Sequence, residues 1–487
     1  MDQLLIALTI AAGISPLLTF THLWQLKEWR IDRLREHLRA EGILRPLFGI
    51  LRPTIILSSF AISYILHFLP AIALATAGTF SILASLILLT ALNILQITVK
   101  KQKYPVWTSK AITLATTSLL LTAALSLYIH YSTFDILLIL LPLLQPFFLL
   151  LTWLLWLPVD HMLKCHTLEE ARALRAEYPD LTVIGITGSV GKTTTKTLLA
   201  HILSDFHPLV TPAYVNTEMG VAQWLIKNAK CKMQNVKLLI VEMGAYRKGE
   251  IRTLCDIVQP TIGIITCIGK QHLGLFGSEQ EIADAKGELC EALPENGHAF
   301  INATTPFVEQ LKEKTKCPMT LVQPQIPFSS IALAVAVAKH FGLSEKTIEE
   351  KCNSFTPPPH TFSMRVESGI TILDDTHNVS PESFHAAIQW AKSQPQKHKV
   401  LMTPGIIELG NEDSLIHEQL GETANPVFDR VIFLNKRHAK MFQRGYGKFG
   451  EGRRVEIYSK TPPPVPQGAL LVCIGRMSDT IIQNILP

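Results

Sequence analysis

The feature that most constrains this chain is residues 54–96, a stretch without a single Asp, Glu, Lys or Arg. As one helix this stretch would be ~65 Å long, at ~1.5 Å per residue, about twice the ~30 Å hydrocarbon core of a bilayer. It therefore predicts two membrane spans, 54–72 and 74–96, with a break near His67 to Pro70.

Three further apolar segments extend this pattern. Residues 4–23 are uncharged and about as long as a helix that crosses a bilayer. They lack the basic start and the A-x-A-like site of a signal peptide. Two more spans are predicted at 111–130 and 136–157, on either side of a break before Asp135. We therefore expect a bundle of five transmembrane helices in a domain of residues 1–160.

The basic residues near these spans lie in two loops, 27–53 and 97–110. They are Lys27, Arg30, Arg33, Arg35, Arg39, Arg45 and Arg52 in the first, and Lys100, Lys101, Lys103 and Lys110 in the second. The positive-inside rule places both loops in the cytoplasm. Five spans then put the N-terminus outside and everything after residue 158 inside, which predicts a multi-pass protein of the cell (inner) membrane.

The basic stretch 27–53 has two open interpretations. It is a juxtamembrane helix lying on anionic membrane lipid, or a site for the head group of a phosphorylated lipid substrate.

Composition supports a membrane part joined to a soluble part. Charged residues make up 17% of the 487 residues, whereas a soluble globular chain has about 25%. This deficit excludes disorder, a coiled coil and a nucleic-acid-binding tail, so we expect no nucleic-acid partner. The eight cysteines form no C-x-x-C pair, which argues against a disulfide framework or a zinc site and favours a reduced, cytosol-facing setting.

After about residue 168, short β-rich runs alternate with helical runs. The predicted strands are 182–187, 237–242, 261–267, 370–374, 399–403, 429–434 and 468–474. This alternation predicts parallel α/β sheets. The proline-rich stretch at 356–359 is the expected linker between two domains, 168–355 and 356–487.

The strongest local signal is VIGITGSVGKTTT at 183–195. An apolar strand leads into a glycine-rich turn, and a helix begins near Gly191. Backbone N–H groups in such a turn can cradle a phosphate. Lys192 would reach the β- and γ-phosphates, and the Thr193 hydroxyl would hold Mg²⁺. The strict G-x-x-x-x-G-K-[ST] pattern fails by one place, because the glycine stands at 185.

The core of this loop, T-G-x-x-G-K-T-T, resembles the phosphate loop of the Mur ligase family. Five further blocks resemble its D-alanyl-D-alanine-adding, MurF-like branch. They are VEMGA at 241–245 with GEI at 249–251, IGKQH at 268–272 with FGS at 276–278, IADAKGE at 282–288, DDTHNVSPES at 374–383, and ELG at 408–410 followed by His417. The resemblance covers about residues 182–487. It implies a P-loop-containing central ATP-binding domain and a Rossmann-like C-terminal domain.

The resemblance also implies the site residues. Those for ATP are Thr187, Gly188, Ser189, Val190, Gly191, Lys192, Thr193, Thr194, Asn216, Ser330, Arg365, Asp375 and Asn378. Those for Mg²⁺ are Thr193, Glu242, His272 and Lys286, the last as a carbamylated lysine. Lys192, His272 and Lys286 are the implied catalytic residues. For Asp375 and Asn378, which precede a predicted helix, capping of that helix is an open alternative.

By resemblance, such a ligase uses ATP to convert a carboxylate into an acyl phosphate, which an amine then attacks. The implied partners are a muramoyl-peptide precursor, UDP-linked or lipid-linked, and a D-alanyl-D-alanine-like amine. The chain departs from the family pattern at several points. Five spans stand where the family has the domain that holds the UDP-sugar. Ser330 stands where the family has an Asn. Ser363 stands where the family has an Arg, and Arg365, two residues later, could substitute for that Arg.

Three alternatives remain open. A poly-γ-glutamate-type membrane ligase would combine the same fold with membrane anchoring. An ATP-driven transporter would use the spans as a pathway, although they offer few ionisable groups, such as His67, His130 and the interfacial Asp135. A scaffold that binds no nucleotide would explain the departures at Ser330 and Ser363.

Overall fold

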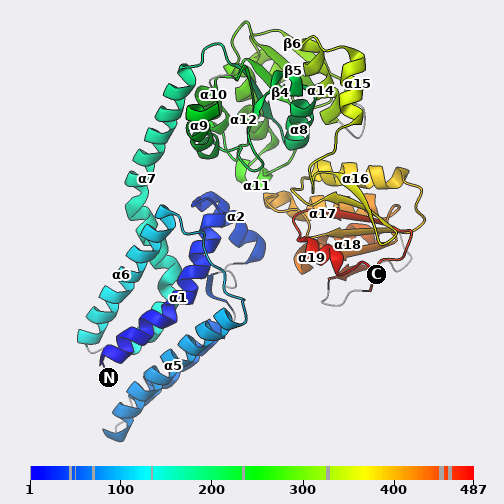
Figure 1. Ribbon diagram of the computed structural model, residues 1–487. Coiled ribbons are helices and arrows are strands. Elements are labelled where there is room, and N and C mark those ends of the chain that lie inside the picture. Colours follow the sequence, from blue (N-terminus) through cyan, green and yellow to red (C-terminus); the bar gives the residue numbers. More distant parts are fainter. Residues whose placement is uncertain are drawn as a thin grey trace. The chain divides into compact units, whose positions relative to one another are not determined.

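The computed structural model describes residues 2–42, 47–49, 51–67, 72–132, 135–232, 236–324, 329–448, 454–458 and 463–487. The chain divides into two compact units, Met1–Leu163 and Lys164–Pro487. Figure 1 shows a helical first unit and a second unit built around β-sheets.

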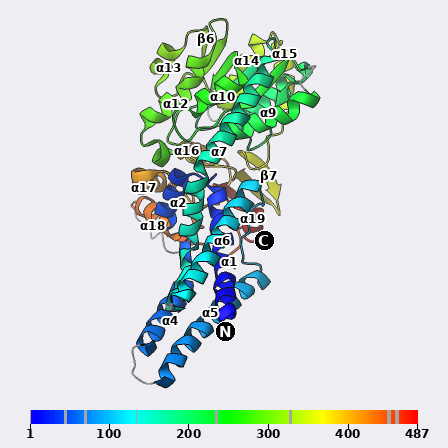
Figure 2. The same ribbon diagram turned by 90° about the vertical axis from the view of Figure 1, so that its left-hand side faces the viewer.

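The first unit consists of helices. They are α1 (Asp2–Leu26), α2 (Ile31–Glu41), α4 (Leu51–His67), α5 (Ile72–Thr98), α6 (Ser109–Tyr131), the 3₁₀ helix η1 (Asp135–Leu144) and the first part of α7 (Gln145–Ala176). Helix α1 packs against α5, α6 and η1, and α4 runs beside α5 (Figure 2). The largest apolar cluster joins side chains such as Leu5, Ile56, Leu86 and Leu138.

Four segments of the described helices are long and apolar enough to cross a membrane: Gln3–Leu26, Thr79–Thr98, Ser109–Tyr131 and Asp135–Ala176. The expected count of five is not reached. Helix α4, in the place of the predicted span 54–72, has 17 residues, and its apolar part is Leu51–Ile62. The predicted break at His67 to Pro70 falls partly outside the described residues.

The basic stretch before α4 is largely ion-paired. On and beside α2, Arg33 contacts Glu28 at 2.6 Å and Arg39 contacts Glu36 at 2.9 Å. Arg52 lies among neutral polar groups, and its Nη2 donates to Asn93 Oδ1 at 3.1 Å and Gln96 Oε1 at 2.7 Å. These contacts tie α4 to α5, so Arg52 is a packing residue of the bundle in this structure. Arg45 lies outside the described residues.

The second unit begins with a six-stranded parallel sheet, in the order β2-β3-β1-β4-β5-β6. Its strands are β1 (Thr182–Thr187), β2 (Leu209–Val210), β3 (Leu238–Glu242), β4 (Ile262–Ile265), β5 (His298–Asn302) and β6 (Met319–Val322). Strands β1 and β3 pair in register from Thr182 with Leu238 to Ile186 with Glu242. This register brings the carboxyl ends of both strands together, where parallel sheets place their ligands.

Helices cover both faces of this sheet because the residues of its strands are apolar on both sides. One face packs against α9 (Glu218–Lys232), α10 (Glu250–Val258) and part of α12 (Glu279–Ala292). The other face packs against α8 (Lys192–Ile202), α14 (Ser329–His340) and α15 (Glu345–Asn353). Three shorter helices connect these elements: η2 (Ser204–Phe206), α11 (Leu273–Phe276) and α13 (Val308–Lys314).

A second sheet follows, with the order β11-β10-β9-β12-β8-β7. Its strands are β7 (Ser363–Glu367), β8 (Ile370–Asp375), β9 (Lys399–Thr403), β10 (Arg430–Phe433), β11 (Val455–Ile457) and β12 (Leu470–Ile474). Only β7 pairs antiparallel, in a hairpin with β8. Helices α16 (Pro381–Ser393), α17 (Asp413–Ala424) and α18 (Lys436–Tyr446) cover one face, and α19 (Asp479–Gln483) packs on the other. The short 3₁₀ helix η4 (Gly410–Glu412) precedes α17.

All seven predicted strands are present, with ends shifted by up to two residues. Five strands were not predicted: β2, β5, β6, β7 and β11. Four of them, β2, β6, β7 and β11, are the edge strands of the two sheets, where less apolar surface is buried and the sequence signal is weaker.

Candidate active site

The glycine-rich turn between β1 and α8 has the backbone of a phosphate cradle. Gly188 has φ 149° and Gly191 has φ 82°, both in the region that favours glycine. A Cβ at Gly188 would clash with the Thr266 hydroxyl, so the turn presents bare backbone at this point. Helix α8 starts directly after Gly191, as predicted, and its N-terminal N–H groups favour an anion.

The rest of the turn is fixed by contacts with the segments that follow β3 and β4. The Ser189 hydroxyl donates to Gly269 O at 3.0 Å, and the Ser189 N–H donates to Cys267 O at 2.7 Å. Thr187 donates its hydroxyl to Met243 O at 3.0 Å, and the Val190 carbonyl accepts from Thr266 at 2.5 Å. Thr187, Ser189 and Val190 therefore shape the turn in this structure.

Lys192 lies inside the turn. Its Nζ donates to Gly188 O at 2.6 Å and to Gln271 Oε1 at 3.4 Å. Burial lowers the pKa of Lys192 below its usual value, although the carboxylate of Glu242 acts in the opposite direction. The ammonium group thus lies where a phosphate on the turn would meet it.

Glu242, at the end of β3, is the centre of a buried polar cluster. Its Oε2 accepts from the Thr193 hydroxyl at 3.0 Å and is 2.9 Å from Lys196 Nζ, and its Oε1 accepts from Asn216 at 3.0 Å. Burial raises the pKa of Glu242, but the charges of Lys196 and Lys192 and these hydrogen bonds outweigh burial, so the pKa lies below its usual value. Glu242 is therefore an ionised carboxylate beside a hydroxyl, a pair of oxygen ligands that suits Mg²⁺.

Asn216 is predicted for ATP and contacts Glu242 here, whereas the contact of Lys196 with Glu242 is not predicted. A signal for Lys196 exists, because it follows Thr193 by three residues on α8 and shares its helix face.

His272 and Lys286 lie on the two segments that follow β4. His272 Nδ1 is 2.5 Å from Glu408 Oε2, and its ring lies 4.6 Å from the ring of Tyr246. Burial lowers the pKa of His272, against the opposing effect of Glu408. Lys286 is 2% exposed. Burial, followed by the nearby charge of Lys192, puts the pKa of Lys286 well below its usual value.

The predicted metal ligands do not all contact one another in the described part of the chain. Thr193 and Glu242 are in contact, whereas no hydrogen bond or ion pair joins them to His272 or Lys286. The block 282–288 also contains a purely structural residue. Glu288 accepts from the N–H groups of Gly249 at 2.6 Å and Arg252 at 2.9 Å, and so caps the start of α10.

The remaining predicted ATP residues divide between the two sheets. Ser330 lies against the turn, since its Oγ donates to Gly191 O at 3.4 Å and would be 2.7 Å from a Cβ at Gly191. Thr194 lies in the first turn of α8 and is half-buried. Arg365 forms an ion pair with the buried carboxylate of Asp374 on β8.

Asp375 and Asn378 do not cap the helix that follows them. Ser380 is the N-cap of α16 and forms a capping box with Ser383. Asp375 instead accepts from the N–H of Phe362 at 3.2 Å, and burial together with Asp374 raises its pKa to about 7. The capping alternative is therefore wrong. Asn378 lies half-buried in the same turn.

A groove with a volume of about 910 Å³ runs between α16 and α17. Its walls are mainly apolar, with Trp390, Ile416 and Leu420 among them. At one end Glu382 accepts from the N–H of Lys270 at 2.7 Å, and its Oε2 is buried without a hydrogen bond. The Glu382 carboxylate packs against Gly269, since a Cβ at that glycine would lie 2.5 Å from Glu382 Oε1.

The phosphate turn and the parallel sheet agree with the comparisons to known proteins. Residues 186–349 match the family profile of the Mur ligase middle domain. This Mur-ligase-like segment contains Lys192, Glu242, His272 and Lys286, and excludes the helical unit.

Curated relatives match a longer part of the chain. The UDP-N-acetylmuramoyl-tripeptide–D-alanyl-D-alanine ligase of Mycobacterium tuberculosis (strain H37Rv) is 29% identical over 291 residues, which are 50% of this chain and 56% of that protein. The enzyme of the same name from Treponema pallidum is 30% identical over 310 residues, 57% of this chain and 66% of that protein. The chain thus spans about half to two thirds of the length of these relatives.

Solved structures share the fold of the second unit. MurF from Acinetobacter baumannii superposes with a TM-score of 0.59 at 22% identity, covering 66% of this chain and 80% of that one. MurF from Thermotoga maritima, in complex with ADP, gives a TM-score of 0.56 at 24% identity and covers 65% and 82%. The second unit therefore has a Mur ligase α/β fold with a parallel sheet.

Proposed function

We propose that this chain is an ATP-dependent amide ligase of cell-wall peptidoglycan precursor synthesis, attached to the cell membrane by its N-terminal helices. The observation that carries the proposal is the cluster at the ends of β1 and β3. Lys192 lies in a phosphate-cradling turn, and the Thr193 hydroxyl and Glu242 carboxylate lie in contact directly beside it. The curated relatives, named UDP-N-acetylmuramoyl-tripeptide–D-alanyl-D-alanine ligases, supply the reaction class.

The proposed reaction has two steps. A substrate carboxylate attacks the γ-phosphorus of ATP, which gives an acyl phosphate and ADP. An amine then attacks the acyl carbon, phosphate leaves, and the nitrogen loses a proton. In the first step the substrate carboxylate and the γ-phosphate of ATP, both anions, must approach each other, so cations are required. Lys192 would stabilise charge on the transferring phosphoryl group. Thr193 and Glu242 would hold Mg²⁺, which neutralises charge on the phosphate oxygens.

Lys286 suits the carbamylation that the family resemblance implies. A lysine reacts with carbon dioxide only as the neutral amine, and burial beside Lys192 favours that form. The product carries a carboxylate, which would serve a second Mg²⁺ together with His272. Native mass spectrometry of the purified protein, with and without bicarbonate, would detect the added carbon dioxide. A Lys286→Met variant that retains the mass increment would contradict this assignment.

The groove between α16 and α17 is the proposed site of the amine substrate. Its mainly apolar walls would contact the small side chains of the amine substrate. The C-terminal domain, residues 356–487, would thus supply the amine to the ATP domain, residues 168–355. Closure of the two would exclude water from the acyl phosphate.

The apolar helices of the first unit bear on which acceptor the enzyme uses. The four candidate spans and the apolar helix α4 are consistent with five spans, an external N-terminus and cytoplasmic catalytic domains. We propose that the muramoyl-peptide acceptor is lipid-linked, or is passed directly to the lipid-linked step. Comparing turnover on UDP-linked and lipid-linked acceptors tests this point. Equal or higher activity on the soluble acceptor would count against it.

The deciding assay follows phosphate release by the full-length protein in nanodiscs. ATP, Mg²⁺ and D-alanyl-D-alanine are supplied with and without a muramoyl-tripeptide in UDP-linked and in lipid-linked form. Release that needs the amine, the acceptor and Lys192, but not the exposed Lys346, supports the ligase. Lys192→Ala and Lys346→Ala are the matched pair. Release without any acceptor would indicate transport or another substrate, and would overturn the proposal.

A further inference from the structure

The carboxylate of Glu408, beside the second sheet, contacts a histidine beside the first sheet. Glu408 lies on the loop 404–409 between β9 and η4, and its Oε2 is 2.5 Å from His272 Nδ1. The Glu408 carbonyl also accepts from the N–H of Gly274 at 2.7 Å. Glu408 has φ 65°, a strained value for a residue with a side chain, so its conformation must be imposed by the surrounding structure.

Two stacked histidines hold the other end of this loop. The Ile406 N–H donates to His417 Nε2 at 3.1 Å, and His438 Nδ1 is 3.0 Å from Pro404 O. The two imidazole rings are 4.4 Å apart with an interplanar angle of 12°. Gly405 lies directly on both rings, since a Cβ there would be 2.6 Å from His438 Nδ1 and 2.8 Å from His417 Nε2. Only glycine fits this position, where φ is 84°.

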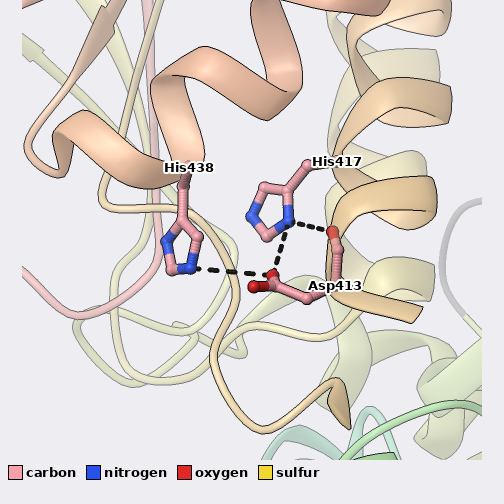
Figure 3. A group of neighbouring side chains, drawn as sticks. All are labelled: Asp413, His417 and His438. Carbon is pink, nitrogen blue, oxygen red and sulfur yellow. Dashed lines mark hydrogen bonds and ion pairs between the residues drawn. The ribbon is translucent and has the colours of Figure 1, made fainter. Parts of the chain in front are cut away.

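The contacts define which nitrogen of each ring carries a proton. His417 Nε2 accepts a hydrogen bond, so the proton is on Nδ1, which donates to Asp413 O at 2.7 Å and lies 3.0 Å from Asp413 Oδ1 (Figure 3). His438 donates from Nδ1 to a carbonyl, and burial and the neighbouring His417 lower its pKa. Both rings are 2% exposed or less.

The same three side chains, Asp413, His417 and His438, are close enough to hold a metal ion. The hydrogen bonds argue against this use. Both nitrogens of His417 are occupied, one by the Ile406 N–H and one by the proton that faces Asp413. If a metal bound His417 Nδ1, the proton of the ring would move to Nε2. That N–H would then face the Ile406 N–H, and the hydrogen bond between them would be lost. The cluster is therefore a hydrogen-bonded support for the loop.

We propose that His417 and His438 are positioning residues that hold Glu408 against His272, so that Glu408 fixes the proton of His272 on Nδ1. A carboxylate on the far nitrogen of a histidine leaves the other nitrogen free for a metal and orients the ring. His272 Nε2 is then the atom available to Mg²⁺. This inference rests on the proposed function, because only the ligase reaction gives that metal its role.

The first test measures the loop itself and needs no activity. Hydrogen exchange of the peptide containing Gly274 in the full-length protein reports whether Glu408 O still accepts its N–H. His417→Phe retains a stacked ring and loses both hydrogen bonds, whereas His417→Gln can restore the acceptor at the Nε2 position. We expect roughly tenfold faster exchange in His417→Phe, the scale of one lost hydrogen bond, and near-normal exchange in His417→Gln. His398→Gln, an exposed histidine, is the control.

The second test measures Mg²⁺ dependence. His417→Phe should raise the Mg²⁺ concentration for half-maximal phosphate release about tenfold, the size of one lost charged hydrogen bond to His272. The KM for ATP should change little. Glu408→Gln should show the same shift, and the double variant should show no further one, because both act through one contact.

The outcomes separate the two proposals. Normal Gly274 exchange in His417→Phe, or additive Mg²⁺ shifts in the double variant, overturns the positioning role. Stoichiometric Co²⁺ binding that is lost in His417→Phe also overturns it and assigns the cluster to a metal. A wild-type protein that releases no phosphate refutes the proposed ligase, while the exchange experiment still decides whether the histidines hold the loop.

Discussion

The buried pair of Lys196 and Glu242 gives the sharpest quantitative prediction. Their side chains are 3% and 5% exposed, and Lys196 Nζ is 2.9 Å from Glu242 Oε2. Lys196→Met retains most of the apolar volume and removes the charge. Glu242 would then remain as a buried carboxylate without its nearest cation.

The structure sets the size of the effect. Removing one partner of a buried ion pair costs about 3–5 kcal/mol. Thr193 and Asn216 still donate to Glu242 in the variant, so we expect a loss near the lower end, about 3 kcal/mol. For a domain of this size, about 2–4 °C of midpoint corresponds to 1 kcal/mol, so the midpoint should fall by about 6–12 °C.

Thermal proteolysis of the full-length protein in nanodiscs measures this midpoint for the part of the chain around the first sheet alone. Peptides from β1 and β3 are followed by mass spectrometry across a temperature ramp. Lys339→Met is the matched control, because Lys339 pairs with Glu345 at 2.6 Å on the exposed surface. Such a surface pair contributes little, so the control should show no measurable shift.

The double variant Lys196→Met/Glu242→Gln tests the cause. It removes both charges, so it should be more stable than Lys196→Met alone. A midpoint in Lys196→Met within about 2 °C of wild type, less than 1 kcal/mol, would refute the charge-pair reasoning. So would a double variant that is no more stable than the single one.

Three further predictions follow from the same unit. Gly188→Ala should abolish ATP binding, measured by calorimetry, because its Cβ would clash with the Thr266 hydroxyl; binding at wild-type affinity would contradict the cradle. Ser380→Ala should cost about 1 kcal/mol of stability in urea unfolding, through loss of the α16 cap, whereas no change would show that the cap is replaced. Asp375 has a pKa raised to about 7 in the folded state. The protonated carboxyl group contributes fully to stability below the unfolded pKa of about 3.9, and this contribution is lost as the pH rises toward 7. The free energy of unfolding of the wild type should therefore fall between about pH 4 and 7, and Asp375→Asn should flatten this fall.

Several features were predictable because neighbouring residues define them. Strand β1, the glycine-rich turn and α8 are contiguous, and the start of α8 after Gly191 follows from the glycine and the polar residues around it. The apolar stretches identify the helices of the first unit by length and charge alone. The predicted count of five spans is not reached among the described residues, since α4 has 17 residues where the span 54–72 was predicted.

Two other features were not predicted, for different reasons. The capping of α16 by Ser380 was available in the sequence, but Asp375 and Asn378 competed for the same role. Edge strands such as β2 and β11 contain two and three residues, too few for a periodic signal.

The sequence by itself determined seven of the twelve described strands, the phosphate-cradling turn and the residue types that surround it. Those features depend on residues a few positions apart, whose contacts form with little loss of chain entropy. Tertiary structure alone decided that Lys196 neutralises Glu242, 46 residues away, and that Glu408 contacts His272 across 136 residues. Contacts of this length depend on how the two sheets and their loops pack, and no local pattern encodes that packing.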